Sequence, residues 1–296
     1  MTEQTILAKK ISIAQNVNWR SFRMAAWLGW QIESNWTDAF LFAVYSIVKP
    51  LASAAILVVM YGVISGGTYT QPIFPYMYLG NAFYIYVGAL LTGVSWTIIQ
   101  DREEYRTFKY MYVAPLSMPF YLLGRGVAKF MVASVSVFIT ILAGVLFLHV
   151  EIDWLRVNWG FFFLILLIGV VMLSVIGLLL AGLTMLMVKH SGILGEAVAG
   201  LLYLFSGAIF PLDVLPKWLQ PIGFFMPLTY WLELLRRALV GQVAQAFPTL
   251  SGYSNAQLMA ILLGLTLVFS FLSVWIFRVC ERIARERGLL DYVSNY

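Results

Sequence analysis

Residues 206–239 read SGAIFPLDVLPKWLQPIGFFMPLTYWLELLRRAL. They decide the fold because they break a predicted transmembrane helix just before it reaches the far side of the membrane. Four prolines, Pro211, Pro216, Pro221 and Pro227, recur every five or six residues. Proline lacks an amide hydrogen and its ring clashes with the preceding turn, so no continuous helix runs through them. The other residues are mostly apolar and aromatic, which suits the outer membrane interface better than water. The stretch therefore predicts a lid of short helices over a pore or exit route.

The details of this outer segment follow from the same residues. We expect a re-entrant turn and a short helix over residues 210–223, and a second helix from about Thr229. Glu233 and Arg237 stand four residues apart with the acid first, so they can pair along that second helix. The outer gate is predicted to contain Phe210, Pro211, Asp213, Pro216, Trp218, Glu233 and Arg237.

Composition predicts an all-α integral membrane protein. Charged residues make up 11% of the chain and hydrophobic residues 61%. The run from Pro50 to Gln100 contains no Asp, Glu, Lys or Arg, which is long enough for two crossings of about 20 residues each. Together with the later uncharged runs, it predicts six transmembrane helices, near residues 39–64, 73–99, 127–148, 159–188, 193–209 and 257–277.

No long polar insert separates these crossings, so residues 39–279 are predicted to form one transmembrane domain. Residues 1–38 would be a cytoplasmic N-terminus with an interfacial helix, and residues 280–296 a cytoplasmic tail. The interfacial helix is predicted because apolar residues recur at helical spacing with Arg20 and Arg23 beside them. These apolar residues are Trp19, Phe22, Ala26 and Trp30.

Basic residues beside the crossings predict the orientation. With the N-terminus inside, fourteen of the 19 basic residues fall on the inner side and four on the outer side, and Lys49 remains inside a helix. We therefore expect a multi-pass protein of the plasma (inner) membrane with both termini in the cytoplasm. The inner residues are Lys9, Lys10, Arg20, Arg23, Arg102, Arg106, Lys109, Arg125, Lys129, Lys189, Arg278, Arg282, Arg285 and Arg287, and the outer ones are Arg156, Lys217, Arg236 and Arg237.

Several kinds of site are absent from the sequence. It contains no G-x-x-x-x-G-K-[ST] phosphate loop and no G-x-S-x-G elbow, so we expect no catalytic residues. The two histidines, His149 and His190, fall at opposite membrane faces, and Cys280 is the single cysteine, so neither a metal site nor a disulfide is expected within one chain. The net charge of +5 is explained by topology and anionic membrane lipid, so no nucleic-acid partner is expected.

The inner loop, residues 101–125, is the candidate surface for a partner. It reads DREEYRTFKYMYVAPLSMPFYLLGR, and its first half has helix-forming residues that end at Pro115 and Pro119. It predicts a short helix along the cytoplasmic surface that exposes Tyr105, Phe108 and Tyr112. A solvated connector with no partner is the alternative reading.

Residues that shape a pathway are predicted from polar positions within the spans. Lys49 lies about ten residues into the first helix, where an ammonium costs about 2.5–3.5 kcal/mol. It either faces a hydrated cavity or extends to the inner headgroups. Pro50 follows it and frees a backbone carbonyl one turn earlier. The candidate pathway residues are Lys49, Asn81, Thr92, Ser95, Glu196 and Tyr203.

Small and polar faces on three helices also fit close helix packing. In the second helix the face is Asn81, Gly88, Thr92 and Ser95, and in the fifth it is Glu196, Gly200, Tyr203 and Gly207. The face of the fourth helix, Ser174, Gly177, Ala181 and Thr184, is predicted to serve packing only. Five aromatics of the second helix fit either an interfacial belt or a surface for sugar rings, namely Tyr76, Tyr78, Phe83, Tyr84 and Tyr86.

The order of these parts resembles the permease subunit of type-2 ATP-binding-cassette exporters. The inner loop EYRTFKYMYVAPLSMPFYLLGR is similar to that family's acidic short helix, Pro-Leu-Ser-like turn and Gly-Arg entry to the third helix. The outer segment resembles its Ser-Gly, Phe-Pro, Leu-Pro-x-Trp-Leu, Pro-Leu-Thr-Tyr and Leu-Arg signature. The resemblance covers most of the chain.

The resemblance implies a dimer of permeases, with a second copy of this chain or a related one, docked on two copies of a cytoplasmic ATPase. ATP and magnesium would bind to that ATPase, and this chain would hold no cofactor and would not be an enzyme. It would export a lipidic, glycan or drug-like substrate. The ATPase-coupling helix would comprise Glu103, Glu104, Tyr105, Arg106, Thr107, Phe108 and Tyr112. Alanine at Tyr105 and Phe108 is expected to uncouple transport and leave the fold intact.

Two other classes of function remain open. An integral-membrane enzyme acting on lipid needs clustered acids or histidines near one face, and Glu151 and Asp153 near Arg156 form the only outer acidic cluster. An ion-coupled secondary carrier needs carboxylates within the membrane, for which Glu196 is the sole candidate in a predicted span.

Overall fold

The computed structural model describes residues 3–35, 38–66, 73–148, 150, 152, 154–155, 157–187, 191–241 and 248–290. His149, His190 and Lys189 lie outside these ranges, as do Glu151, Asp153, Arg156 and residues 291–296 of the predicted tail. Within them the regular structure is helical. The α-helices are α1 Glu3–Asn35, α2 Ala39–Ile64, α3 Ile73–Tyr86, α4 Gly93–Ile99, α5 Phe108–Met111, α6 Met118–Leu148, α7 Trp159–Leu186, α8 Ser191–Phe205, α9 Gln220–Phe224, α10 Pro227–Val240, α11 Pro248–Ser251 and α12 Asn255–Glu286.

Among the described residues, five helices are long and apolar enough to cross a membrane. They span residues Phe40–Ile64, Ile73–Glu104, Met118–Leu148, Trp159–Leu186 and Asn255–Glu286. The fifth predicted crossing, residues 193–209, corresponds to α8, which is apolar but has only 15 residues. The chain is therefore an all-helical, multi-pass membrane protein, as the composition predicted.

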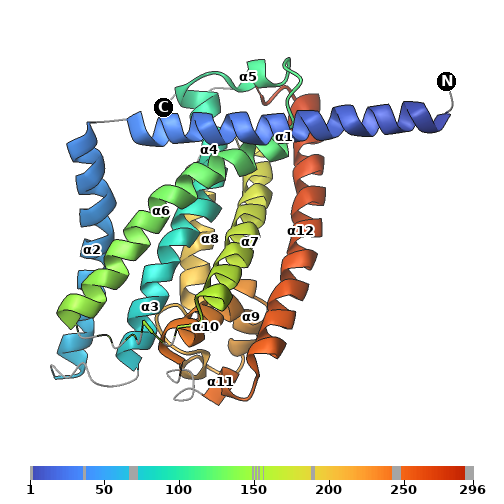
Figure 1. Cartoon of the computed structure of the whole chain (residues 1–296). Helices are drawn as coiled ribbons and strands as arrows, with labels where there is room; N and C mark the ends of the chain where they lie inside the picture. The colour runs from blue at the N-terminus through green and yellow to red at the C-terminus, as the bar shows by residue number, and fades with distance from the viewer. Residues whose placement is uncertain are drawn as a thin grey trace.

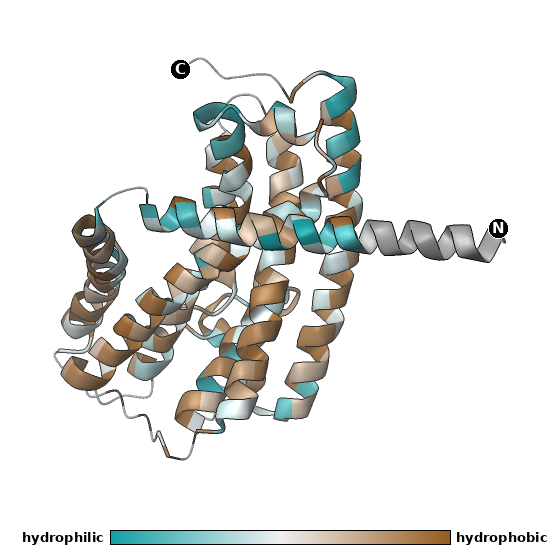
Figure 2. Cartoon of the chain, turned by 45° about the horizontal axis from the view of Figure 1, so that its top comes forward, coloured by the Kyte–Doolittle hydropathy of each residue, from teal (hydrophilic) through white to brown (hydrophobic). Residues whose placement is uncertain are grey.

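The long helices form a bundle with short helices at both ends (Figure 1). At one end, α1 lies across the bundle and packs mainly on α6, and α5 lies nearby; we call this the α5 end. At the other end, α9, α10 and α11 lie together below α7 and α8 and beside the lower part of α12, and we call this the α10 end. Hydrophilic residues gather on α1 and at the α5 end, whereas the long helices are largely hydrophobic (Figure 2).

The second crossing is a continuous rod made of four helical pieces. Between α3 and α4 lies the π-helical segment η1, Val87–Thr92, and a second π-helical segment, η2, Gln100–Glu104, ends the rod. This rod is the most buried crossing, with 61% of its most apolar window inside the protein against 17% for α2. It therefore runs through the centre of the bundle from the α10 end to the α5 end.

The predicted packing face of α7 is confirmed. Gly177 lies so close to the rod that a Cβ there would approach the Leu90 carbonyl oxygen to 2.8 Å. The Thr184 hydroxyl is hydrogen-bonded to that of Ser95 at 2.7 Å. All four residues of the face, Ser174, Gly177, Ala181 and Thr184, are buried.

Helix α2 stands at the edge of the bundle, where it contacts mainly α6 and α3. Pro50 lies inside it and provides no amide for the carbonyl of Ser46. The Ser136 hydroxyl of α6 donates to that carbonyl at 2.9 Å. The proline therefore frees a carbonyl one turn earlier, as predicted, and the freed group joins two helices.

We expect Ser136→Ala to lower the free energy of unfolding by about 0.6 kcal/mol, a typical value for a hydrogen bond between membrane helices. The same substitution in a Pro50→Ala background should cost less, because the alanine returns an amide to the Ser46 carbonyl. Thermal unfolding in detergent micelles measures both. Ser270→Ala is the matched control, because the Ser270 hydroxyl bonds only within its own helix, to Thr266 at 2.7 Å. Equal costs in both backgrounds would contradict this account of the proline.

Helix α10 is held against the bundle by one large aromatic side chain. Trp231 is fully buried, and its indole nitrogen donates to the Ile165 carbonyl of α7 at 2.9 Å. A Cβ at Gly169 would lie 1.8 Å from that nitrogen, so only glycine leaves room for the ring. The short helices at the α10 end are thus fixed to a long helix of the bundle.

Candidate functional site

The proline-rich segment at the α10 end forms short helices in place of one continuous helix, as the proline spacing predicted. A 3-10 turn, η3, covers Leu212–Val214, and α9 and α10 follow. Pro221 and Pro227 lie in the first turns of α9 and α10, where a missing amide costs no helical hydrogen bond. The second helix begins at Pro227, two residues before the predicted start.

The predicted gate residues divide into exposed and buried groups. Asp213, Pro216 and Trp218 are exposed, and Trp218 is 76% exposed. Pro211 and Glu233 are buried, whereas Phe210 and Arg237 are partly buried.

The pairing of Glu233 with Arg237 is confirmed at 2.9 Å. Arg237 also donates to the carbonyls of Leu250 and Tyr253, each at 2.7 Å. This arginine therefore ties α10 to the start of the last crossing.

Arg236 is the residue of this segment that the sequence analysis missed. It is 2% exposed, and its guanidinium carbon lies 3.6 Å from the centre of the Tyr76 ring. Its Nη2 donates to the carbonyls of Gly207 at 2.8 Å and Ala208 at 2.9 Å, and its Nε to that of Tyr76 at 3.0 Å. A Cβ at Gly80 would lie 2.1 Å from Nη2, so this glycine leaves room for the guanidinium. Arg236 therefore joins α10, the rod and the chain that leaves α8.

The predicted coupling residues lie at the α5 end, but they do not form one exposed helix. The rod ends at Glu104, and Arg106 has a positive φ of 54°, which turns the chain before α5 begins. The amide of Thr107 closes this turn by donating to the Asp101 carbonyl at 2.9 Å. Glu104, Tyr105, Arg106 and Thr107 are exposed, and we call these residues the α5 turn.

The predicted exposure of Phe108 is wrong. Phe108 is 2% exposed and belongs to a core cluster with Tyr121, Met185 and Phe277, because the turn at Arg106 points it back into the bundle. Tyr112 is half-buried, and the guanidinium of Arg285 lies 4.7 Å from the centre of its ring. Burial raises the pKa of the Tyr112 phenol, and the nearby Glu281 carboxylate raises it further. Tyr105 alone of the three aromatics is exposed as predicted.

A buried polar cluster anchors the α5 turn to the bundle. Asp101 is 1% exposed and accepts a hydrogen bond from the Tyr121 hydroxyl at 2.9 Å. Arg125, also 1% exposed, lies 3.4 Å from the other Asp101 oxygen and donates to the Tyr121 hydroxyl at 3.1 Å. Glu103 pairs with Arg102 at 3.0 Å, and Arg102 also donates to the Met187 carbonyl. The sequence predicted Asp101 and Arg125 only as the two ends of the candidate partner loop, because their spacing does not show that α6 lies opposite the rod.

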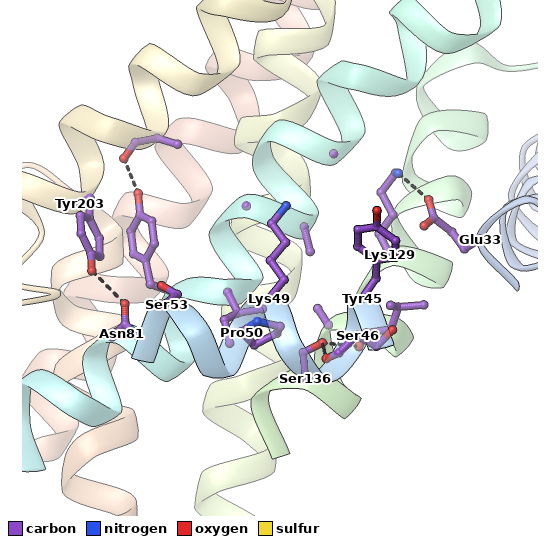
Figure 3. Close-up of a pocket in the computed structure, with 18 of the residues that line it drawn as sticks. Glu33, Tyr45, Ser46, Lys49, Pro50, Ser53, Asn81, Lys129, Ser136 and Tyr203 are labelled. Carbon is purple, nitrogen blue, oxygen red and sulfur yellow. Dashed lines mark hydrogen bonds and ion pairs between the residues drawn. The ribbon is translucent and has the colours of Figure 1, made fainter. Parts of the chain in front are cut away.

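A cavity of about 750 Å³ lies between α2, the rod, α6 and α8 (Figure 3). Of the predicted pathway residues it brings together Lys49, Asn81 and Tyr203. The Tyr203 hydroxyl donates to the Asn81 side-chain oxygen at 2.8 Å. Gly88 in η1 and Gly200 in α8 also line it, so the small faces of the rod and of α8 contribute to a cavity as well as to packing.

The other three predicted pathway residues lie elsewhere. Thr92, Ser95 and Glu196 line a separate pocket of about 230 Å³ between the rod and α8. The aromatics of the rod form no interfacial belt, because Tyr76, Tyr78, Phe83 and Tyr86 are buried in the protein. Tyr84 lines the larger cavity, and its hydroxyl donates to the Ala199 carbonyl.

Within the described ranges no group of three or more His, Cys, Asp or Glu residues could hold a metal ion. Three features of the described residues are candidates for a functional role: the α5 turn, the larger cavity and the short helices of the α10 end. The rod joins all three, because it ends at the turn, lines the cavity and meets Arg236 at Tyr76.

The family model described as ABC-2 type transporter matches residues 22–240, which include part of α1, the rod, the α5 turn, the cavity and α10. No curated protein matches the chain.

Proposed function

Because the chain belongs to the ABC-2 type transporter family, and is thus a membrane transport component, we propose that it is the permease of an exporter driven by a separate cytoplasmic ATPase. It would move a lipidic, glycan or drug-like substrate outward. Two ATPase copies and a second permease chain, as a homodimer, would complete the machine. ATP and magnesium would bind to the ATPase, and this chain would hydrolyse nothing.

The observation that carries this proposal is the continuous helical path from the α5 turn to the cavity. The exposed turn begins at Glu104, the last residue of η2, and the buried cluster of Asp101, Tyr121 and Arg125 fixes it to α6. Gly88 and Gly93 of the same rod line the cavity. A protein that pushes on the turn would therefore move the cavity wall, which supports coupling between a docked ATPase and a substrate route. Co-purification of the chain with an ATP-binding-cassette ATPase encoded beside it tests the proposal.

We also propose that the α5 end faces the cytoplasm of a plasma-membrane protein with six crossings. The charges of the described residues support this orientation, since Arg102, Lys109, Arg278 and Arg285 lie toward that end. Helix α1 would lie in the inner interface, where exposed Trp19 and Trp30 suit the headgroup region. Helix α8 would be the short fifth crossing, and η3, α9 and α10 would form the re-entrant outer lid.

Single cysteines at the exposed residues Asp213 and Lys217 should react with an impermeant thiol reagent from outside intact cells. A cysteine at Gln220 should react more slowly, because this position is partly buried. Cys280, which is buried, is first replaced by alanine. The labelling rates are compared between intact cells and inside-out vesicles. Faster labelling in the inside-out vesicles would contradict both the lid and the orientation.

A further inference from the structure

Among the described residues, Lys49 is the cation of the larger cavity that has no partner. Lys49 extends from α2 into the cavity, and it has no ion pair or hydrogen bond among the residues that the structure describes (Figure 3). It lies ten residues after the start of α2, which is about 15 Å along the helix. An unpaired ammonium at that depth in a membrane is costly and marks a functional position.

The other charges of the cavity are already neutralised. Lys129 of α6 forms an ion pair of 2.6 Å with Glu33 at the end of α1, as the dashed line in Figure 3 shows. Since Lys49, Lys129 and Glu33 are its charged lining residues, the cavity has a net charge of about +1 at neutral pH. This charge favours an anion.

Most of the other polar groups of the cavity form hydrogen bonds with each other. Tyr203 bonds to Asn81, Tyr84 to the Ala199 carbonyl and Ser136 to the Ser46 carbonyl. Ser53 stands one turn after Lys49 on α2 and lines the same cavity, so a hydroxyl lies on the same face as the ammonium. The site thus offers an anion one ammonium and a neighbouring hydroxyl.

Apolar side chains and open space make up the rest of the lining. Phe42, Ile85 and Val132 contribute hydrocarbon walls. A Cβ at Gly88 or Gly200 would meet nothing within 4 Å, so neither glycine is needed for close packing. A volume of about 750 Å³ lies in the range of small-molecule sites. A bare inorganic anion would leave these walls unfilled.

We propose that this cavity binds an anionic amphiphile, with the negative headgroup on Lys49 and the hydrocarbon part against the apolar walls. Phosphate is the headgroup that we test, because a lipid or a lipid-linked substrate would supply it. Binding of the amphiphile does not depend on the proposed function. The inference rests on the proposed function only for the further step, in which the bound amphiphile is the exported substrate.

The test uses the full chain in micelles of dodecyl maltoside, an uncharged detergent with the same dodecyl chain as the two charged amphiphiles used as probes. Gly200→Cys in a Cys280→Ala background places a thiol in the cavity without a clash. Monododecyl phosphate should slow its reaction with N-ethylmaleimide at least fivefold. Dodecyltrimethylammonium and inorganic phosphate should each slow it less than twofold. The matched control is Gly264→Cys on α12, where a Cβ also meets nothing within 4 Å but which lines neither of the two cavities described above, and its rate should not change.

Lys49→Gln should abolish the protection and Lys49→Arg should retain it. Equal protection by the cationic amphiphile would overturn the proposal, because it would show an apolar groove with no preference for charge. Equal protection by inorganic phosphate would overturn the proposal, because it would show that the ligand is a soluble anion and not an amphiphile. Protection that survives Lys49→Gln would show that Lys49 does not bind the headgroup. The assay needs no ATPase. If monododecyl phosphate gives no protection but the chain still moves on ATP hydrolysis by its ATPase, this inference alone is rejected. Protection in a chain that binds no ATPase rejects only the proposed function.

Discussion

A chain carrying Tyr105→Ala and Arg106→Ala should fold like the wild type but bind its ATPase about 30-fold more weakly. Tyr105 is 39% exposed and Arg106 is exposed, so their truncation removes no core contact. Aromatic and arginine side chains are the usual hot spots of interfaces, and loss of one costs about 2 kcal/mol or more, which corresponds to about 30-fold in affinity. Binding of the purified ATPase to immobilised chain measures the change.

The matched control is Tyr253→Ala. The exposed fraction of Tyr253, 44%, is similar to the 39% of Tyr105, but Tyr253 lies at the α10 end. Arg237 contacts its backbone carbonyl and not its ring. This variant should bind the ATPase normally. Phe108→Ala is unsuitable for the test, because this buried phenylalanine is part of the core and its loss would cost about 3–5 kcal/mol of stability. Unchanged ATPase binding by the Tyr105 and Arg106 double variant would remove the α5 turn from the interface.

The second large effect is expected at Arg236, whose replacement by alanine should destabilise the protein by at least about 3 kcal/mol. Three buried carbonyls lose a charged donor, and each hydrogen bond to a charged group contributes about 1.5–3 kcal/mol. Lysine should rescue little of the loss, because its ammonium cannot reproduce the planar fork of the guanidinium. Thermal unfolding and size-exclusion chromatography in detergent micelles measure the effect.

Two further variants keep this expectation testable if Arg236→Ala does not fold. Gly80→Ala should also destabilise, since its Cβ would lie 1.9 Å from the Ala208 carbonyl oxygen and 2.1 Å from Arg236 Nη2. Lys217→Ala, at an exposed position of the same proline-rich segment, should change stability by no more than about 0.5 kcal/mol. Wild-type unfolding temperatures for Arg236→Ala and Gly80→Ala would show that the guanidinium is not a structural joint.

The elements that depend on local sequence physics could be predicted. Long uncharged runs predicted the crossings, and the proline spacing predicted the break between α8 and α10. The pair of Glu233 and Arg237 followed from helical spacing alone. Boundaries were less accurate: the predicted third crossing begins at residue 127, but α6 begins at Met118, because Pro119 fits the first turn of a helix instead of ending one.

The features that depend on tertiary contacts could not be predicted. Arg236 and Arg237 are adjacent in sequence, and nothing local distinguishes the buried one from the partly exposed one. Phe108 was expected on an exposed helix, because the positive φ at Arg106 that turns it inward leaves no mark in the composition. The partners of Asp101, Tyr121 and Arg125, and the grouping of Lys49 with Asn81 and Tyr203, depend on which helices lie side by side.

The central claim is that ATP hydrolysis by another chain moves this one. The most direct measurement uses Asp213→Cys, in a Cys280→Ala background, in proteoliposomes with the bound ATPase. Its labelling rate by an impermeant thiol reagent is followed with and without ATP and magnesium. We predict a change of at least threefold on ATP addition, which disappears when Tyr105 and Arg106 are replaced by alanine. An identical labelling rate with and without ATP, while the bound ATPase hydrolyses it, would contradict the account.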